Sequence, residues 1–293
     1  MSRRGWVLFV AMGVIWGIPY LLIKVAVADI APASLVFLRT AIGALLLVPF
    51  AARRGRLRLL LPHWRWVVLY TVIELAIPWL LLSYAERRLS SSLSGLLVAA
   101  VPFVGALTAL VLRSDDRLDR RRAAGLVVGF AGVAALVGLD LSGGDALSFA
   151  EVAVVVTGYA TAPAIIARRL STVPSLAVVA GSLALTATLY APVGILQLPS
   201  SLPPVNVLLA VAGLGVVCTA IAFLVFFALI AEVGPVRATV ITYLNPAVAL
   251  VLGVLVLSEP LTAGAAIGFA LILCGSVLAT RSVKPTNVPL LER

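Results

Sequence analysis

The chain has 293 residues, of which 62% are hydrophobic and 12% charged, and its formal net charge is +10. Soluble domains are ~45–50% apolar and ~25% charged, so the composition excludes a soluble fold and indicates that lipid is the solvent. Both cysteines, Cys218 and Cys274, lie in apolar runs. They therefore indicate packing residues rather than a disulfide or a metal pair, and no cofactor is expected.

Ten apolar runs are long enough to cross a bilayer as helices, which takes ~20 residues each. In chain order they cover residues 6–27, 33–51, 65–84, 91–112, 122–139, 149–167, 174–196, 205–229, 234–257 and 262–280. Strands of a membrane barrel alternate with period two over ~10 residues, whereas these runs are continuously apolar. The sequence therefore predicts an all-α integral membrane protein.

The second half of the chain repeats the first half at an offset of about 144 positions. Pro102 and Pro246 are 144 positions apart, and each lies in an apolar run that ends in a serine followed by an acidic residue. One duplicated unit accounts for nearly the whole chain. We place the first repeat at residues 5–139, the second at 149–280, and a disordered cytoplasmic tail at 281–293.

Each repeat contains five spans, an odd number, so two consecutive copies must insert with opposite orientations. The loop at 113–122 holds five arginines, whereas its counterpart at 258–262 holds no Lys or Arg. The same position therefore faces the cytoplasm once and the exterior once. Ten transmembrane helices in two inverted five-helix repeats are typical of transporters that work by alternating access.

The basic residues also predict the orientation of the whole chain. With a cytoplasmic N-terminus, 18 of the 22 Lys and Arg residues lie on the cytoplasmic side and only Arg87 and Arg88 lie on the opposite side. This bias predicts that both termini are cytoplasmic. The membrane that we expect is a bacterial inner membrane. The positive charge is thus an orientation signal that favours contact with anionic lipid, and a nucleic-acid partner is not expected.

Glu74 is the one acidic residue deep inside a predicted span. It lies ten residues beyond Trp64, hence ~15 Å along the third helix and near the middle of the membrane. An ionisable group at that depth is costly and usually faces a polar cavity. Glu74 is a candidate to bind a substrate amine or to couple transport to protons; the alternative is a protonated carboxyl group that bonds a neighbouring helix.

Lys24 and Arg39 lie a few residues from the outer ends of their helices. Long basic side chains at such positions usually extend to the membrane surface, and this is the expected state of both. The alternative is that one of them is a charge partner of Glu74 or binds a substrate carboxylate. Arg39 is the better candidate, because it lies about six residues inside its span.

Aromatic and polar side chains in the middle of several spans are candidates to line an apolar pocket with few polar anchors, as small-molecule sites usually are. Taken singly, each aromatic residue also suits packing or contact with lipid. Asn245, a mid-span amide beside a proline, is a candidate polar anchor. The full set, with Glu74, is Trp16, Tyr20, Tyr70, Pro78, Trp79, Tyr84, Phe227, Tyr243 and Asn245.

Pro102 and Pro246 occupy matching positions in the fourth and ninth spans. Proline inside a helix kinks it and frees a carbonyl group. We hypothesise that these two helices bend to open opposite gates; a static kink is the alternative. The glycine pairs at 13/17, 125/129 and 264/268 have the spacing that lets helices approach closely, so they indicate packing.

Several stretches resemble the drug/metabolite transporter superfamily, specifically its EamA-type ten-helix permeases. The resemblance rests on WGIPYLLIKVA in the first span, FLRTAIGALLL in the second, and the SDDRL and SEPLT loops, with Glu259 in the family's acidic position. The first repeat departs from the pattern at Asp115 and Asp116. The resemblance implies export of small metabolites, and a YddG-like branch implies neutral and aromatic amino acids.

Three alternatives to an amino-acid exporter are open. Within the superfamily, the alternative cargo is a drug, a sugar or a nucleotide sugar. An intramembrane enzyme would need a catalytic set at membrane depth, which one deep carboxylate does not provide. A membrane scaffold would not need an inverted repeat. We expect a monomeric secondary transporter whose partners are a small-molecule substrate and membrane lipid.

Overall fold

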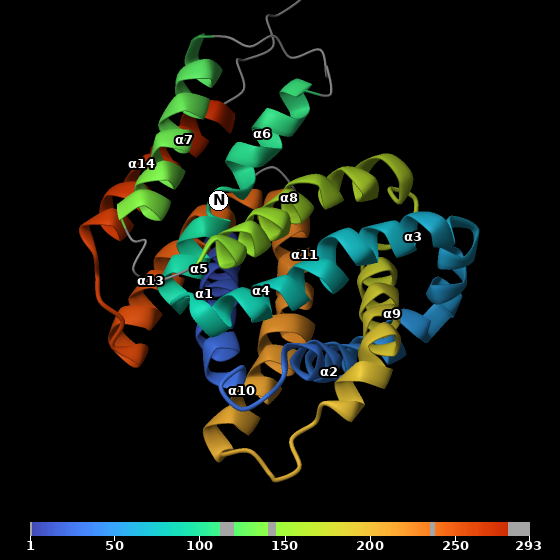
Figure 1. Cartoon of the computed structure of the whole chain (residues 1–293). Helices are drawn as coiled ribbons and strands as arrows, with labels where there is room; N and C mark the ends of the chain where they lie inside the picture. The colour runs from blue at the N-terminus through green and yellow to red at the C-terminus, as the bar shows by residue number, and fades with distance from the viewer. Residues whose placement is uncertain (1, 112–119, 140–144, 235–237, 281–293) are drawn as a thin grey trace, which may run out of the picture.

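The computed structural model describes residues 2–111, 120–139, 145–234 and 238–280, and the regular structure in these ranges is helical (Figure 1). The first repeat contains α1 (Arg3–Ala26), α2 (Pro32–Ala52), the 3-10 segment η1 (Arg53–His63), α3 (Trp64–Tyr70), the π segment η2 (Thr71–Ala76), α4 (Ile77–Arg88), α5 (Ser91–Val98), α6 (Val101–Val111) and α7 (Arg120–Leu139). The second contains α8 (Ala146–Arg169), α9 (Ser175–Leu196), α10 (Val205–Gly215), the π segment η4 (Val216–Ile221), α11 (Ala222–Val233), the 3-10 segment η5 (Thr239–Tyr243), α13 (Leu244–Leu257) and α14 (Ala263–Thr280).

Ten of these helical stretches have the character of membrane spans. Seven are long and apolar enough to cross a bilayer, and three shorter apolar helices complete the set, at Ala123–Ala135, Ile241–Leu257 and Ala263–Gly275. Large apolar side chains on the outside, such as Leu196 at 85% and Leu255 at 75% exposure, suit lipid and not water. The predicted all-helical membrane fold is confirmed.

Helices at matching positions of the two repeats pack against each other: α2 against α9, α5 against α13, and α7 against α14 (Figure 1). Such pairing of equivalent elements is what an approximate two-fold axis between the halves produces. Glycine allows the closest of these contacts, because a Cβ added at Gly275 would lie 2.3 Å from the backbone nitrogen of Gly129. The packing role predicted for the glycine pairs of α7 and α14 is therefore confirmed.

Both predicted proline kinks appear as breaks in their spans. The fourth span stops at Val98, turns at residues 99–100 and resumes as α6 with Pro102 in its first turn. The ninth span begins as η5 and continues as α13 with Pro246 in its first turn. Proline suits these places because a first-turn residue needs no N–H for the helix. A hinge role for the two breaks stays a prediction.

The third and eighth spans each contain a π segment at the same place in the repeat, η2 and η4. Their first residues, Thr71 and Val216, are 145 positions apart. Segments of this kind widen the helix and are frequent at functional sites. Glu74 and Thr219, which are repeat-mates, occupy equivalent positions in them, so both π segments present a polar side chain near the middle of a span.

The loops at 27–31, 89–90, 197–204 and 258–262 lie at one end of the helices, here called the outer end because the charge distribution predicts that it faces the exterior. At the other end, the loop expected between the second and third spans is folded as the 3-10 segment η1. The predicted SDDRL loop and the tail 281–293 lie outside the described residues.

Candidate functional site

Arg39 of α2 points into the protein, and only 7% of the residue is exposed. Its Nε donates a hydrogen bond to Thr219 Oγ1 at 3.0 Å, and its Cζ lies 3.7 Å from the centre of the Trp79 ring. A desolvated cation over an indole face gains ~2 kcal/mol. The expectation that Arg39 reaches the membrane surface is therefore wrong, because Thr219 and Trp79 give it partners inside.

Glu74 of η2 is half-buried, and its Oε2 atom is buried with no hydrogen-bond partner among the described residues. Leaving such an oxygen unpaired costs free energy unless a proton or a ligand completes it. The ion pairs within the described ranges are Arg4–Glu232, Arg88–Asp145 and Arg88–Glu151, so Glu74 pairs with neither candidate cation.

Tyr159 of α8 lies between two buried clusters of the core. Its hydroxyl group is within electrostatic range of both Glu74 and Arg39. Its ring packs on the buried cluster that contains Tyr70 and Trp79 and also on the neighbouring cluster that contains Tyr20. Helices from both repeats therefore meet around Tyr159, and among the described residues Glu74 and Arg39 form no ion pair with each other.

Two of the other predicted site residues, Trp16 and Phe227, belong to one group of aromatic rings. Trp16 of α1 contacts Phe223 and Phe226 of α11, with ring centroids 6.0 and 4.8 Å away, and Phe223 stacks on Phe227 at 6.2 Å. These rings form an aromatic wall between α1 and α11, and Phe223 and Phe227 also pack on the cluster of Tyr70 and Trp79. Tyr84 of α4 is half-buried and within electrostatic range of Tyr190 of α9.

Asn245 acts as a link between helices. With its amide nitrogen turned toward them, it donates to the carbonyl oxygen of Gly13 at 3.2 Å and to that of Ile241 at 3.0 Å. This pairing joins α13 to α1 at the point where the ninth span breaks. Tyr243 precedes the same break and is also half-buried.

Lys24 of α1 is not paired with Glu74. Its Nζ donates to the carbonyl oxygens of Glu86 and Leu89, each at 2.7 Å, where α4 ends at the outer end. Lys24 therefore belongs to a second polar group, separate from Arg39 and Glu74.

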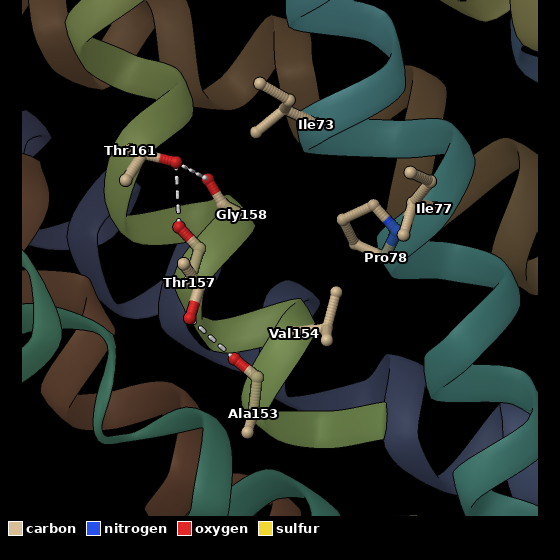
Figure 2. A pocket seen from close by; sticks show the side chains of 8 residues that line it. All are labelled: Ile73, Ile77, Pro78, Ala153, Val154, Thr157, Gly158 and Thr161. Atoms are coloured by element: carbon tan, nitrogen blue, oxygen red, sulfur yellow. Dashed lines mark hydrogen bonds between the residues drawn. The ribbon is translucent and has the colours of Figure 1, made fainter. Parts of the chain in front are cut away.

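A groove of about 400 Å³ runs between the third span and α8 (Figure 2). Ile73, Ile77 and Pro78 form one side, and the face of α8 around Val154 forms the other. The hydroxyl groups of Thr157 and Thr161 bond to carbonyl oxygens of their own helix, so the groove is almost wholly apolar (Figure 2). Pro78 lines this groove, one turn from Glu74.

Two residues of the site were not predicted as such: Tyr159 and Thr219. Thr219 had a usable signal, since it is the repeat-mate of Glu74. Tyr159 had only its place in the middle of a span. Across the described residues, no group of three His, Cys, Asp or Glu side chains could hold a metal ion.

The comparisons with known proteins agree with this architecture. The model of the EamA-like transporter family matches the chain twice, at residues 3–138 and 148–281. The chain belongs to the EamA-like transporter family. It is thus a multi-pass membrane transporter of the drug/metabolite transporter superfamily.

One solved structure, described only as the crystal structure of a protein, resembles this transporter over nearly its whole length. The two are 25% identical with a TM-score of 0.67, and the alignment covers 96% of this chain and 97% of the other. A comparison with curated proteins gives no match.

Proposed function

We propose that this transporter exports neutral amino acids, aromatic ones among them, across a bacterial inner membrane by alternating access. The observation that carries the proposal is the placement of Arg39 and Glu74. They lie on consecutive spans, both are within electrostatic range of Tyr159, and neither has an ionic partner among the described residues. A zwitterion offers one carboxylate and one ammonium group, which complement a guanidinium and a carboxylate.

The surroundings of this pair favour an apolar side chain on the cargo. Trp16, Phe223 and Phe227 form an aromatic wall nearby, and Tyr70 and Trp79 belong to the cluster on which it packs. A basic or acidic cargo would bring an extra charge to these rings without a partner, which is costly away from water. Neutral amino acids should therefore be preferred over basic and acidic ones.

The direct test is uptake into proteoliposomes of four radiolabelled amino acids: one aromatic, one small neutral, one basic and one acidic. We expect saturable uptake of the first two, and a loss of at least ~10-fold in kcat/KM for Glu74→Gln and for Arg39→Lys, since each removes an interaction with a charged group. Glu232→Gln is the control, because that glutamate lies at the inner end beside Arg4.

The competing cargo within the superfamily is a sugar, nucleotide sugar or drug. Uptake of such a compound with no uptake of amino acids would reject the amino-acid proposal and leave the transporter fold intact. Amino-acid uptake that is equal in wild type and Glu74→Gln at every pH would reject the role given to Glu74.

A further inference from the structure

Glu86 is a fully buried carboxyl group at the outer end. It lies in the last turn of α4, with 0% of the residue exposed, and both carboxyl oxygens lack a hydrogen-bond partner. Its surroundings are closed to solvent as well, since Leu89 and Ser94 are also 0% exposed. An ionised carboxylate with no hydrogen bond in such a place would be far more costly than a neutral one.

Two charged neighbours of Glu86, Lys24 and Glu259, bond other groups. Lys24 Nζ donates hydrogen bonds to the carbonyl oxygens of Glu86 and Leu89, which have no partner within α4 because the helix ends there. Glu259, from the second repeat, accepts hydrogen bonds from the backbone N–H groups of Ser91 at 2.7 Å and Ser92 at 2.9 Å, at the start of α5. Both arrangements match charge to helix end: a cation at a C-terminus and an anion at an N-terminus.

These contacts assign the charges of the outer end. Glu259 has two backbone donors and is the natural anion, and Lys24 is the matching cation. A negative charge on Glu86 would have no hydrogen-bond donor, because Lys24 donates to the two carbonyl oxygens instead. A neutral, protonated Glu86 therefore suits this buried arrangement better than a carboxylate does.

We propose that Glu86 is a proton-binding site: its carboxyl group is protonated while the outer end of the transporter is closed, and it loses the proton when the outer end opens. Opening separates α1 and the 258–262 loop from the hairpin between α4 and α5, which admits water and frees the Lys24 ammonium group. The O–H bond of the Glu86 carboxyl then breaks, the proton passes to water, and the carboxylate is stabilised by Lys24. The inference rests on the transporter function of the family and not on the identity of the cargo.

Other titratable groups near Glu86 do not replace it in this role. Tyr20 of α1, Arg39 of α2 and Tyr159 of α8 lie within electrostatic range of it. Arg39 is held by Thr219 and Trp79. On α4 itself, Arg88 is bound to Glu151 and Asp145, and hydrogen bonds from Ser148 lower the pKa of Asp145.

The test measures access to the outer end against external pH, in intact cells and without substrate. Ser94→Cys, in a background of Cys218→Ala and Cys274→Ala, is labelled with a membrane-impermeant maleimide. Leu202→Cys, at a loop position that is 85% exposed, is the reference for the pH dependence of the thiol itself. The quantity compared is the ratio of labelling at position 94 to labelling at this reference position. We expect the labelling ratio to rise with pH by up to ~10-fold per unit, the limit for one linked proton. In Glu86→Gln the ratio should be low and independent of pH.

Matched variants separate the role of Glu86 from a general effect. Glu232→Gln, at the matching position of the second repeat, should keep the wild-type pH dependence, and Glu86→Asp should restore it. If Glu86→Gln does not reach the cell surface, Glu86→Met tests the same loss of titration at similar volume. A flat wild-type ratio, or a slope that persists without a carboxyl group at position 86, would overturn the proposal. Because no amino acid is present, failure of the cargo assignment would not affect this result.

Discussion

Thr219→Val is the sharpest perturbation of the site. Valine has nearly the shape of threonine but no oxygen, so the bond from Arg39 Nε at 3.0 Å is lost while the volume is kept. A hydrogen bond to a charged group contributes ~1.5–3 kcal/mol. Arg39 would remain over Trp79 but would be free to turn away from the position that suits a carboxylate. If about 1.4 kcal/mol of the loss appears in substrate binding, KM rises ~10-fold.

The assay is concentration-dependent uptake into proteoliposomes, with thermal unfolding in detergent as a check on folding. Thr186→Val is the matched control, because Thr186 is also fully buried but donates only to the Ser182 carbonyl of its own helix. We expect its KM to stay within ~2-fold of wild type. A folded Thr219→Val protein with wild-type KM would refute the reasoning, since Arg39 would then not depend on Thr219 for its function.

Two further predictions concern packing and motion. Gly275→Ala should destabilise the protein by ~1–3 kcal/mol relative to Gly105→Ala, as measured by thermal unfolding. The added Cβ at position 275 would meet the Gly129 backbone at 2.3 Å, whereas the nearest atom at Gly105 is 4.0 Å away. Equal stabilities would contradict the close contact of α7 and α14. Pro102→Ala and Pro246→Ala should slow the exchange of substrate across the membrane several-fold. Substrate should still raise the unfolding temperature of both variants, because a hinge affects motion and not binding. Wild-type exchange rates in both variants would count against that role.

The fold was predictable because lipid imposes simple rules on a sequence. Span length, the bias of Lys and Arg, and the offset between Pro102 and Pro246 are one-dimensional signals, and they led to the inverted repeat. The breaks and π segments were harder. The sequence around Thr71 or Val216 has no pattern that distinguishes a π segment from an α-helix. The extra residue in the turn depends on packing against neighbouring spans.

The site was predictable in part, for a related reason. Glu74 was found because a lone carboxylate at membrane depth is conspicuous. Arg39 was expected at the surface because its distance from the helix end allows it to reach water, and only the structure shows that Thr219 and Trp79 hold it inside. Glu86 was not among the predicted site residues, since a glutamate one turn from a helix end usually reaches solvent. Its burial depends on contacts from α1 and the second repeat, which no local pattern contains.

The most direct test of the zwitterion-binding account is competition against uptake of radiolabelled phenylalanine in proteoliposomes. Three competitors are compared: unlabelled phenylalanine, phenethylamine, which lacks the carboxylate, and 3-phenylpropionate, which lacks the ammonium group. If Arg39 and Glu74 bind opposite ends of the cargo, phenylalanine should compete at least ~10-fold better than either analogue, and Arg39→Lys should remove most of its advantage over phenethylamine. Equal competition by all three compounds, or no uptake of phenylalanine above protein-free vesicles, would contradict the account.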